Sequence, residues 1–319
     1  MEEAGREAIL EALDGYARNP LSFLVRYDAP WRAFALGGGT IAYLEARRAA
    51  VAWADPLCAE DGIAGLLGEF TRAMRAERRG VCLIAVSEET ARVALAAGFS
   101  ALKVGEEPWF DLSSWRIPRG NRGKKLRWAV NHARRAGVTV EELEPGGEEE
   151  VEAVLRRWRA ELHRPEPTSF LRAAPLAERD AKRIFLARRG GRAEAVLACA
   201  RLPAVDGWYL EDLLRMPEAV SGATELLVVE TLARLDGASA AFAMAPMRGV
   251  QTQLDRRARR VGLLLSVGFR TFDRRYRFRA IARYEGRFEP TEWRSRYVAF
   301  LPAFPRPAVI RAAVRYLAA

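Results

Sequence analysis

The residues whose types and spacing best suit chemistry are Asp212 and Arg215, which flank two leucines just before a loop containing proline, serine and glycine. A carboxylate here could orient or deprotonate a nucleophile, and the arginine could hold a phosphate through its planar fork of N–H groups. Ser221 and Gly222 follow, and a helix is expected over residues 225–235. Free backbone N–H groups at a helix start favour an anion, so the loop is a candidate phosphate site. A purely structural ion pair between Asp212 and Arg215 is the alternative.

A second group of residues suits a polyanion. The chain has no acidic residue between Asp111 and Glu141, although this stretch is rich in arginine and lysine. An unneutralised basic run attracts phosphates, with an affinity that falls as salt rises, and Trp115 and Trp128 could stack on bases. An ordinary solvated helix face would show the same pattern. The cations that we expect to bind tRNA or another phosphate-bearing partner here are Arg122, Lys124, Lys125 and Arg127.

A third stretch, residues 256–283, interleaves arginines with aromatic residues. Alternation of this kind predicts strands with aromatics inward and arginines outward. Such a surface could bind nucleic acid or anionic lipid, or it could be ordinary strand patterning.

Several kinds of chemistry lack support. Neither the nucleotide signature GxGxxG nor the acetyltransferase pattern Q/R-x-x-G-x-G/A is present, which disfavours acetyl-CoA as a donor. No serine lies in a Gly-x-Ser-x-Gly turn, and Cys58, Cys82 and Cys199 lack the spacing of a metal or disulfide site. We therefore expect no metal, no cofactor and no covalent serine or cysteine intermediate. His132 is expected on a basic helix surface, without a catalytic role.

Composition is consistent with a phosphate-bearing partner. The formal net charge is 51 − 41 = +10, and most of the positive charge is arginine. A chain of 319 residues is long enough for about two domains. No apolar run approaches the ~18 residues of a membrane span, and the acidic start is unlike a signal peptide. A cytoplasmic protein is expected, with any contact to an anionic membrane being peripheral.

The elements that must position these residues occur in the same order twice. The first copy has a buried strand at 81–86, a helix ending at Gly98-Phe99 and a further strand. The second copy has a strand at 238–244, a helix ending at Gly268-Phe269 and a strand-like stretch to 278. This order is typical of the acetyltransferase (GNAT) fold. We predict an α/β (α+β) protein with tandem GNAT-like lobes joined by a basic helix. The predicted ranges are 1–115 for the N-terminal lobe, 116–136 for the basic linker helix and 137–319 for the C-terminal catalytic lobe.

Three further expectations concern strands. Residues 32–53 alternate as strands around a glycine turn, and residues 99–104 and 109–112 read as two separate strands. If the segment from Trp208 is extended, Asp212 and Arg215 point to opposite sides, because side chains alternate along a strand. We therefore expect the strand to bulge or end near Leu213, so that the two groups can share a site.

Taken in order, several segments resemble the C-terminal catalytic domain of phosphatidylglycerol lysyltransferases, the multiple peptide resistance factor family. The similar segments are Trp53-Ala54-Asp55-Pro56, Val104-Gly105-Glu106-Glu107 with Asp111-Leu112, Gly123–Arg127 with Asn131 and Gly137, Asp212-Leu213-Leu214-Arg215 with Gly222 and Glu225, Met244-Ala245-Pro246-Met247, and Phe278 through Tyr297. Each motif is short, and it is their collinear order from about residue 50 onward that carries the resemblance.

The resemblance implies tandem acetyltransferase-like lobes and transfer of an aminoacyl group from tRNA to a lipid headgroup hydroxyl. It implies functional roles for Asp212 and Arg215, and for a basic residue at Arg283 or Arg287. The chain departs from the family where Glu285 and Gly286 replace Lys and Glu, and it lacks the family's multi-span membrane domain. These departures leave the acceptor open between a lipid headgroup and a small molecule. The alternatives are an acyl-CoA-dependent N-acyltransferase and a non-catalytic protein that binds RNA or anionic lipid.

Overall fold

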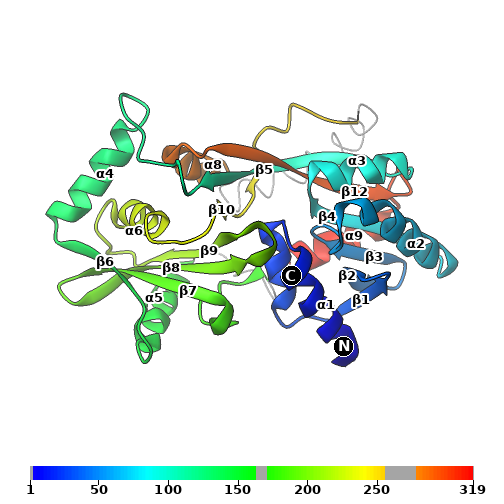
Figure 1. The fold of residues 1–319 in the computed structure, drawn as a ribbon, viewed down its shortest axis with the longest axis horizontal. Helices are drawn as coiled ribbons and strands as arrows, with labels where there is room; N and C mark the ends of the chain where they lie inside the picture. The colour runs from blue at the N-terminus through cyan, green and yellow to red at the C-terminus, as the bar shows by residue number, and fades with distance from the viewer. Residues whose placement is uncertain (1–2, 163–170, 256–277, 319) are drawn as a thin grey trace.

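The computed structural model describes residues 3–162, 171–255 and 278–318 of the chain (Figure 1). Within these ranges the strands form one mixed sheet that runs through the whole molecule, with helices on both faces. The predicted α/β class is therefore confirmed. Among the described residues, no helix has the length and apolar character needed to cross a bilayer.

The first half begins with three antiparallel strands, and a helix then crosses over to a fourth strand that runs parallel to the third. The crossover helix buries Ile63, Leu67, Phe70 and Met74, which recur at helical spacing. A second helix, capped by the Ser87 hydroxyl on the N–H of Thr90, leads to a long strand. These elements are β1 (Trp31–Leu36), β2 (Gly39–Ala46), β3 (Ala49–Trp53), α2 (Ile63–Ala76), β4 (Gly80–Val86), α3 (Glu88–Ala96) and β5 (Ser100–Asp111).

The second half has the same order. Antiparallel strands are followed by a helix that crosses over to a strand parallel to the last of them. The elements are α4 (Lys124–Arg135), β6 (Val138–Glu142), α5 (Glu148–Ala160), β7 (Lys182–Arg189), β8 (Arg192–Leu202), β9 (Gly207–Arg215), α6 (Ala223–Leu232) and β10 (Ser239–Phe242). The repeat predicted from the sequence begins at the crossover strands themselves, β4 and β10, and the helix end predicted at Gly268-Phe269 lies outside the described residues.

The two halves share the sheet instead of forming separate sheets. Strand β12 (Glu292–Leu301) comes late in the chain but lies between β4 and β5, and β10 pairs with the other edge of β5. The order is β1-β2-β3-β4-β12-β5-β10-β9-β8-β7-β6, so β5 and β12 run side by side from one half to the other (Figure 1). The range 137–319 therefore contributes a central strand to the first half, and the predicted domain boundaries stay predictions.

The helices complete the layers. In the first half α2 and α3 cover one face, while α1 (Glu3–Tyr16), η1 (Pro20–Arg26) and α9 (Pro307–Ala318) cover the other. In the second half α6 and α5 lie on opposite faces of β8 and β9. The basic helix α4 connects the halves in sequence. In space it packs on α6 within the second half, and the sheet makes the physical join.

Two local predictions were wrong. Residues 100–111 form the single strand β5 instead of two strands, because Glu107 is buried against an arginine of β12 and continues the pairing. Residues 278–283, the end of the stretch 256–283 expected as strands, lie in helix α8 (Phe278–Glu285), which is followed by the short helix η6 (Gly286–Phe288). Tyr284 and Phe288, four residues apart, pack against each other at a helical spacing. The helix and strand expected over residues 256–277 lie outside the described residues.

Candidate functional site

Strand β9 bulges at Glu211. Its neighbours Leu210 and Asp212 keep their partners on β8, whereas Glu211 has none there. Leu210 and Leu213 both pack in the core beneath α6, so the two carboxylate residues between them are turned to the opposite face. The irregularity expected near Leu213 therefore exists, two residues earlier. It gathers two acids on one face of the sheet.

A buried network holds the bulge. Lys182 Nζ lies 2.8 Å from Glu211 Oε2, and the exposed fractions of the two side chains are 0% and 4%. The Tyr27 hydroxyl, from the first half of the chain, donates to Glu211 Oε1 at 2.5 Å and accepts from Lys182 Nζ at 2.6 Å. Burial, and then the Glu211 charge, raise the pKa of Tyr27 far above its ordinary value, so this phenol stays protonated. The bulge is thus fixed by a residue from each half.

Asp212 is tied to the same network through one peptide group. Its Oδ2 accepts the N–H of Ala174 at 2.9 Å, while the carbonyl of Ala174 accepts from Lys182 Nζ at 3.1 Å. A carboxylate held by a backbone donor has a fixed orientation, which a group that positions or deprotonates an acceptor requires. The sequence pointed to Asp212 but missed Tyr27, Lys182 and Glu211, whose proximity arises from non-local pairing.

Arg215 lies on the other face of β9. Beyond the bulge the side chains alternate: Leu213 packs beneath α6 and Leu214 beneath α5, so Asp212 and Arg215 point to opposite sides. The expectation that an irregularity would place both on one face was wrong, because the bulge precedes Asp212 instead of following it. The positive charge of Arg215 lowers the pKa of the Tyr284 hydroxyl, opposing the larger effect of burial.

Arg215 and Arg287 converge on the start of α6. Burial is the main cause that raises the pKa of Tyr284, the charge of Glu225 raises it further, and both arginines oppose that shift. Arg287 Nη1 donates to Glu225 Oε1 at 2.8 Å in the first turn of α6. Arg287 therefore lies at the start of α6, close to Ser221-Gly222, and Arg215 is near enough for its charge to lower the pKa of Tyr284. A helix start of this kind suits a phosphate.

Gly222 also explains how the basic helix is placed. It precedes α6 with φ of +90°, and a Cβ on it would lie 2.1 Å from the carbonyl oxygen of Ala129 in α4. Only glycine permits this approach. Farther along, Arg134 of α4 pairs with Glu230 of α6 at 2.5 Å. The basic helix therefore rests directly on the candidate phosphate site.

The cations of α4 differ in their availability. The guanidinium of Arg127 is engaged by the carbonyl oxygens of Pro118 and Gly120, the latter at 2.7 Å, and so braces the preceding loop. Arg122, Lys124 and Lys125 are exposed and form no ion pair with a described acid. These three suit a phosphate partner better than Arg127 does.

Arg283 lies in α8, one turn before Arg287. It is exposed, whereas Arg287, on the following turn, reaches Glu225. Of the two basic residues that the resemblance suggested, Arg287 is therefore the one that the structure places at the start of α6. The rest of the basic stretch, residues 256–277, lies outside the described part of the chain.

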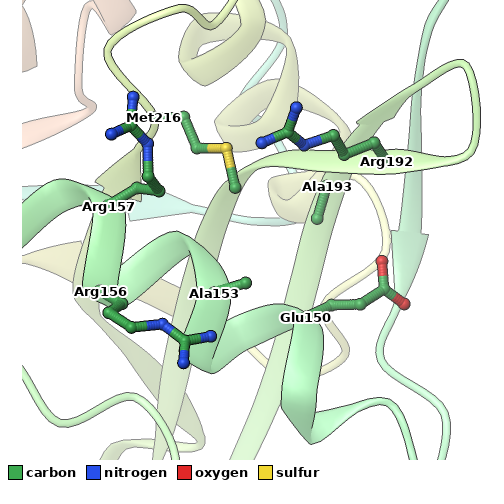
Figure 2. A pocket seen from close by; sticks show the side chains of 7 residues that line it. All are labelled: Glu150, Ala153, Arg156, Arg157, Arg192, Ala193 and Met216. Atoms are coloured by element: carbon green, nitrogen blue, oxygen red, sulfur yellow. The ribbon is translucent and has the colours of Figure 1, made fainter.

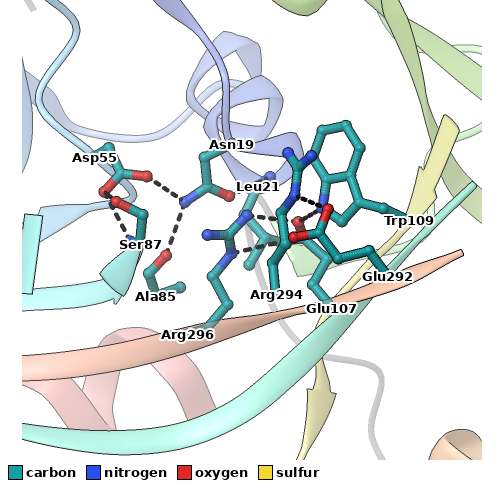
Figure 3. Close-up of polar contacts among 10 residues, drawn as sticks. All are labelled: Asn19, Leu21, Asp55, Ala85, Ser87, Glu107, Trp109, Glu292, Arg294 and Arg296. Carbon is teal, nitrogen blue, oxygen red and sulfur yellow. Dashed lines mark hydrogen bonds and ion pairs between the residues drawn. The ribbon is translucent and has the colours of Figure 1, made fainter. Parts of the chain in front are cut away.

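A second polar centre is buried where β5 and β12 cross the middle of the molecule (Figure 3). Arg296 donates to Glu107 through Nε at 3.0 Å and Nη2 at 2.5 Å, and Trp109 Nε1 donates to Glu107 at 2.6 Å. The exposed fractions of the Arg296 and Glu107 side chains are 4% and 0%. These hydrogen bonds hold β12 against β5 at this point. Because burying the two charges costs solvation energy, the pair adds little to the net free energy of unfolding.

Asp55, at the end of β3, belongs to the same region. Its Oδ1 accepts from the N–H and hydroxyl of Ser87, each at 2.8 Å, and its Oδ2 accepts from Asn19 Nδ2 at 2.9 Å (Figure 3). Ala54 and Ala85 beside it adopt positive φ of 58° and 59°, strained conformations for alanine. Asp55, Glu107 and Arg296 all come from segments that carry the family resemblance, so those motifs meet in this centre.

A cavity of about 260 Å³ lies on the α5 face of the second half (Figure 2). Its apolar floor is formed by Ala153, Ala193 and Met216, and three arginines and Glu150 complete the lining. Glu218 lies within ion-pair distance of Arg157 and Arg192, at 3.3 and 3.6 Å. None of the predicted site residues lines it.

Within the described ranges, no three His, Cys, Asp or Glu side chains are grouped so as to hold a metal ion. All three cysteines are buried, and burial raises the pKa of each thiol, which disfavours the reactive thiolate.

Comparison with known proteins supplies a family. The model of the family described as phosphatidylglycerol lysyltransferase, C-terminal, matches residues 15–300. No curated protein matches the chain.

Solved structures share the fold. The C-terminal domain (DUF2156) of a putative lysylphosphatidylglycerol synthetase from Agrobacterium fabrum is 22% identical with a TM-score of 0.78, over 98% of this chain and 96% of that one. L-PGS from Bacillus licheniformis is 20% identical with a TM-score of 0.76, over 99% and 95%. A conserved protein of unknown function from Bacteroides thetaiotaomicron is 13% identical with a TM-score of 0.66, over 94% and 98%. At these identities the likeness shows the fold alone.

Proposed function

The chain belongs to the phosphatidylglycerol lysyltransferase C-terminal family, and from this premise we propose that it moves an aminoacyl group from an aminoacyl-tRNA to an acceptor hydroxyl or amine. The acceptor is a lipid headgroup or a small molecule. The observation that carries the proposal is the exposed basic helix α4 resting on the cationic start of α6, within a chain of this family.

The donor needs a polyanion site. Arg122, Lys124 and Lys125 present unneutralised charge on and just before α4. Beneath it, Arg215 is exposed, and Arg287 forms an ion pair with Glu225. Arginine forks and helix starts both bind phosphate oxygens well. We assign the tRNA backbone to the α4 surface. A nearby phosphate is assigned to the group formed by Arg215, Ser221, Gly222 and Arg287, with Arg283 contributing from α8.

The reaction is an acyl transfer from an ester that is already activated. The acceptor oxygen or nitrogen attacks the ester carbonyl carbon, the bond from that carbon to the ribose oxygen breaks, and the acceptor proton ends on the departing ribose oxygen. Asp212 is proposed to orient the acceptor and take its proton. Because Asp212 lies on the opposite face of β9 from Arg215, the aminoacyl end of the tRNA has to reach past this strand from the α6 side. Holding the two reactants in this geometry supplies much of the acceleration. No step requires a metal or cofactor.

The buried network beside Asp212 supports this role. Lys182 pairs with Glu211, the second carboxylate of the bulge, so a cation offsets the charge of that acid. The N–H of Ala174 fixes the carboxylate orientation. Because the donor is made in the cytoplasm, we propose that the reaction occurs there. A lipid acceptor would require peripheral contact with an anionic membrane.

The test is incubation of the purified protein with a pool of charged tRNA and with lipid and metabolite extracts, followed by mass spectrometry. We expect an acceptor that gains the mass of one aminoacyl group, with no gain when the tRNA is deacylated. Transfer only from acyl-CoA would contradict the proposal and favour an N-acyltransferase. Salt-sensitive RNA binding without any turnover would also contradict it and favour a non-catalytic binder.

A further inference from the structure

Helix α4 presents an aromatic pair to solvent. Trp128 is 61% exposed, and its ring stacks on that of His132 with 5.1 Å between centroids and 9° between planes. The residues that anchor the helix, Leu126, Ala129 and Val130 among them, lie on the opposite face. The stacked pair therefore contributes nothing to the core, and the exposed ring face is available to a partner.

The charges around the pair point to the partner. Lys124, Trp128, His132 and Arg135 follow one another at spacings of four, four and three residues, so they form one stripe along the helix. Lys124 and Arg135 are exposed and form no ion pair with any acid among the described residues. A flat aromatic face between two available cations matches the alternation of base and phosphate along a nucleic-acid strand.

We propose that Trp128 and His132 form a stacking platform for one unpaired base of RNA, with Lys124 and Arg135 binding the flanking phosphates. The platform rests on the proposed function in that the RNA is the aminoacyl-tRNA donor. An unpaired base is required, because bases inside an A-form duplex are already stacked and expose no face. The single-stranded acceptor end of a tRNA offers such bases.

A membrane is the less favoured occupant. Helices that lie in a membrane interface bury a broad apolar face, whereas the solvent face of α4 carries one large apolar side chain among Lys124, Lys125, Asn131 and Arg135. One aromatic face is sufficient for a base but covers little lipid.

The experiment measures the affinity for two RNA hairpins, one with a single-stranded 3′ end and one blunt, by fluorescence anisotropy at several salt concentrations. We expect Trp128→Ala to weaken binding of the overhanging hairpin by about 5- to 150-fold, the range for one base–aromatic stack. Binding of the blunt hairpin should be unchanged. Trp128→Phe should recover most of the loss.

Two controls separate stacking from other causes. Phe304→Ala removes an aromatic that is 67% exposed in the other half and should leave both affinities unchanged. Trp128→Ala should leave the salt dependence unchanged, whereas Lys124→Ala should lower its slope by about one. Melting temperatures check that each variant folds.

The outcomes distinguish this platform from the proposed function. If the native protein transfers an aminoacyl group and Trp128→Ala binds the overhanging hairpin as tightly as before, the platform is wrong and the function stands. If nothing is transferred but Trp128→Ala loses the overhanging hairpin, the platform stands and the function is wrong. Loss of binding to anionic vesicles, with RNA affinity intact, would assign the pair to a membrane and overturn the platform.

Discussion

The two strand-to-helix junctions, β3 to α2 and β9 to α6, occupy the same place in the repeated order but differ in charge. At the first, both carboxylate oxygens of Asp55 accept hydrogen bonds, from Ser87 and Asn19. Two further acids, Glu60 and Asp61, precede the helix. At the second, a bulge gathers two acids on one face and arginines surround the helix start on the other. The first junction carries acids before its helix, whereas the second is where we propose that a phosphate binds. Repeated topology therefore does not determine a site; the side chains at the junction do.

The largest expected effect is a contrast between Asp212→Asn and Asp55→Asn. Asparagine at 212 can still accept the N–H of Ala174 but is not a base, so we expect aminoacyl transfer to fall by about 10²- to 10⁴-fold with tRNA affinity and melting temperature little changed. Asp55→Asn should instead lower the melting temperature and leave the rate per folded molecule intact. Rate assays beside thermal unfolding check both, and equal rate losses in the two variants would erase the contrast.

The next effect concerns the buried pair that holds the second junction. Lys182→Met leaves Glu211 without its neutralising partner, and we expect the free energy of unfolding to fall by about 3–5 kcal/mol. Urea unfolding measures this. Arg183→Met, on the same strand but partly exposed, serves as the control and should cost under about 1 kcal/mol. Equal losses in the two variants would show that the buried network does not hold the bulge.

A smaller effect tests the basic helix of the second junction. Removing Lys124 and Lys125 together should lower the slope of log affinity for tRNA against log salt by about two. Arg72→Ala with Arg75→Ala on α2 removes the same charge from the first half and should leave the slope unchanged. Arg127→Ala is expected to lower the melting temperature, because the loop then loses the hydrogen bonds from this guanidinium to the carbonyl oxygens of Pro118 and Gly120. Identical slopes for the native protein and the double lysine variant would remove α4 from the tRNA site.

The smallest effect concerns Glu285, near the central polar pair. Burial, then the charge of Glu107, raise the pKa of this carboxyl well above its ordinary value, and Arg248 opposes them. The folded state thus keeps a proton that the unfolded state loses near pH 4.3, so this group lowers stability as pH rises above that value. Glu285→Gln should remove a dependence of up to about 1.4 kcal/mol per pH unit. The free energy of unfolding of the native protein and of Glu285→Gln is measured from pH 5 to 8. The same pH dependence in both proteins would contradict this prediction.

What the sequence could predict was local. The apolar spacing of Leu126, Ala129 and Val130 predicted α4, and the Gly98 ending predicted α3, because both signals lie within one turn of helix. The resemblance pointed to Asp212 and Arg215 without showing that they lie on opposite faces. Alternation along a regular strand puts residues three apart on opposite faces, and only the pairing with β8 shows that the bulge falls before Asp212 and leaves this alternation intact.

The remaining site residues could not be predicted because they meet across the chain. Tyr27 and Lys182 reach Glu211 from distant segments, and nothing near any of them marks the contact. Glu107 was expected in the gap between two strands predicted at 99–104 and 109–112. Only its pairing with Arg296, far along the chain, makes the strand continuous.

The position of β12 has a consequence for synthesis on the ribosome. Strands β4 and β5 leave the exit tunnel early, but the strand that fills the space between them is translated after most of the second half. Until then the nascent first half carries two unpaired sheet edges, which are prone to pair with other chains. Closing so long a loop also slows folding. The first half thus reaches its native sheet only after the second has been made, and a chain truncated before residue 292 would leave both halves to chaperones or proteases.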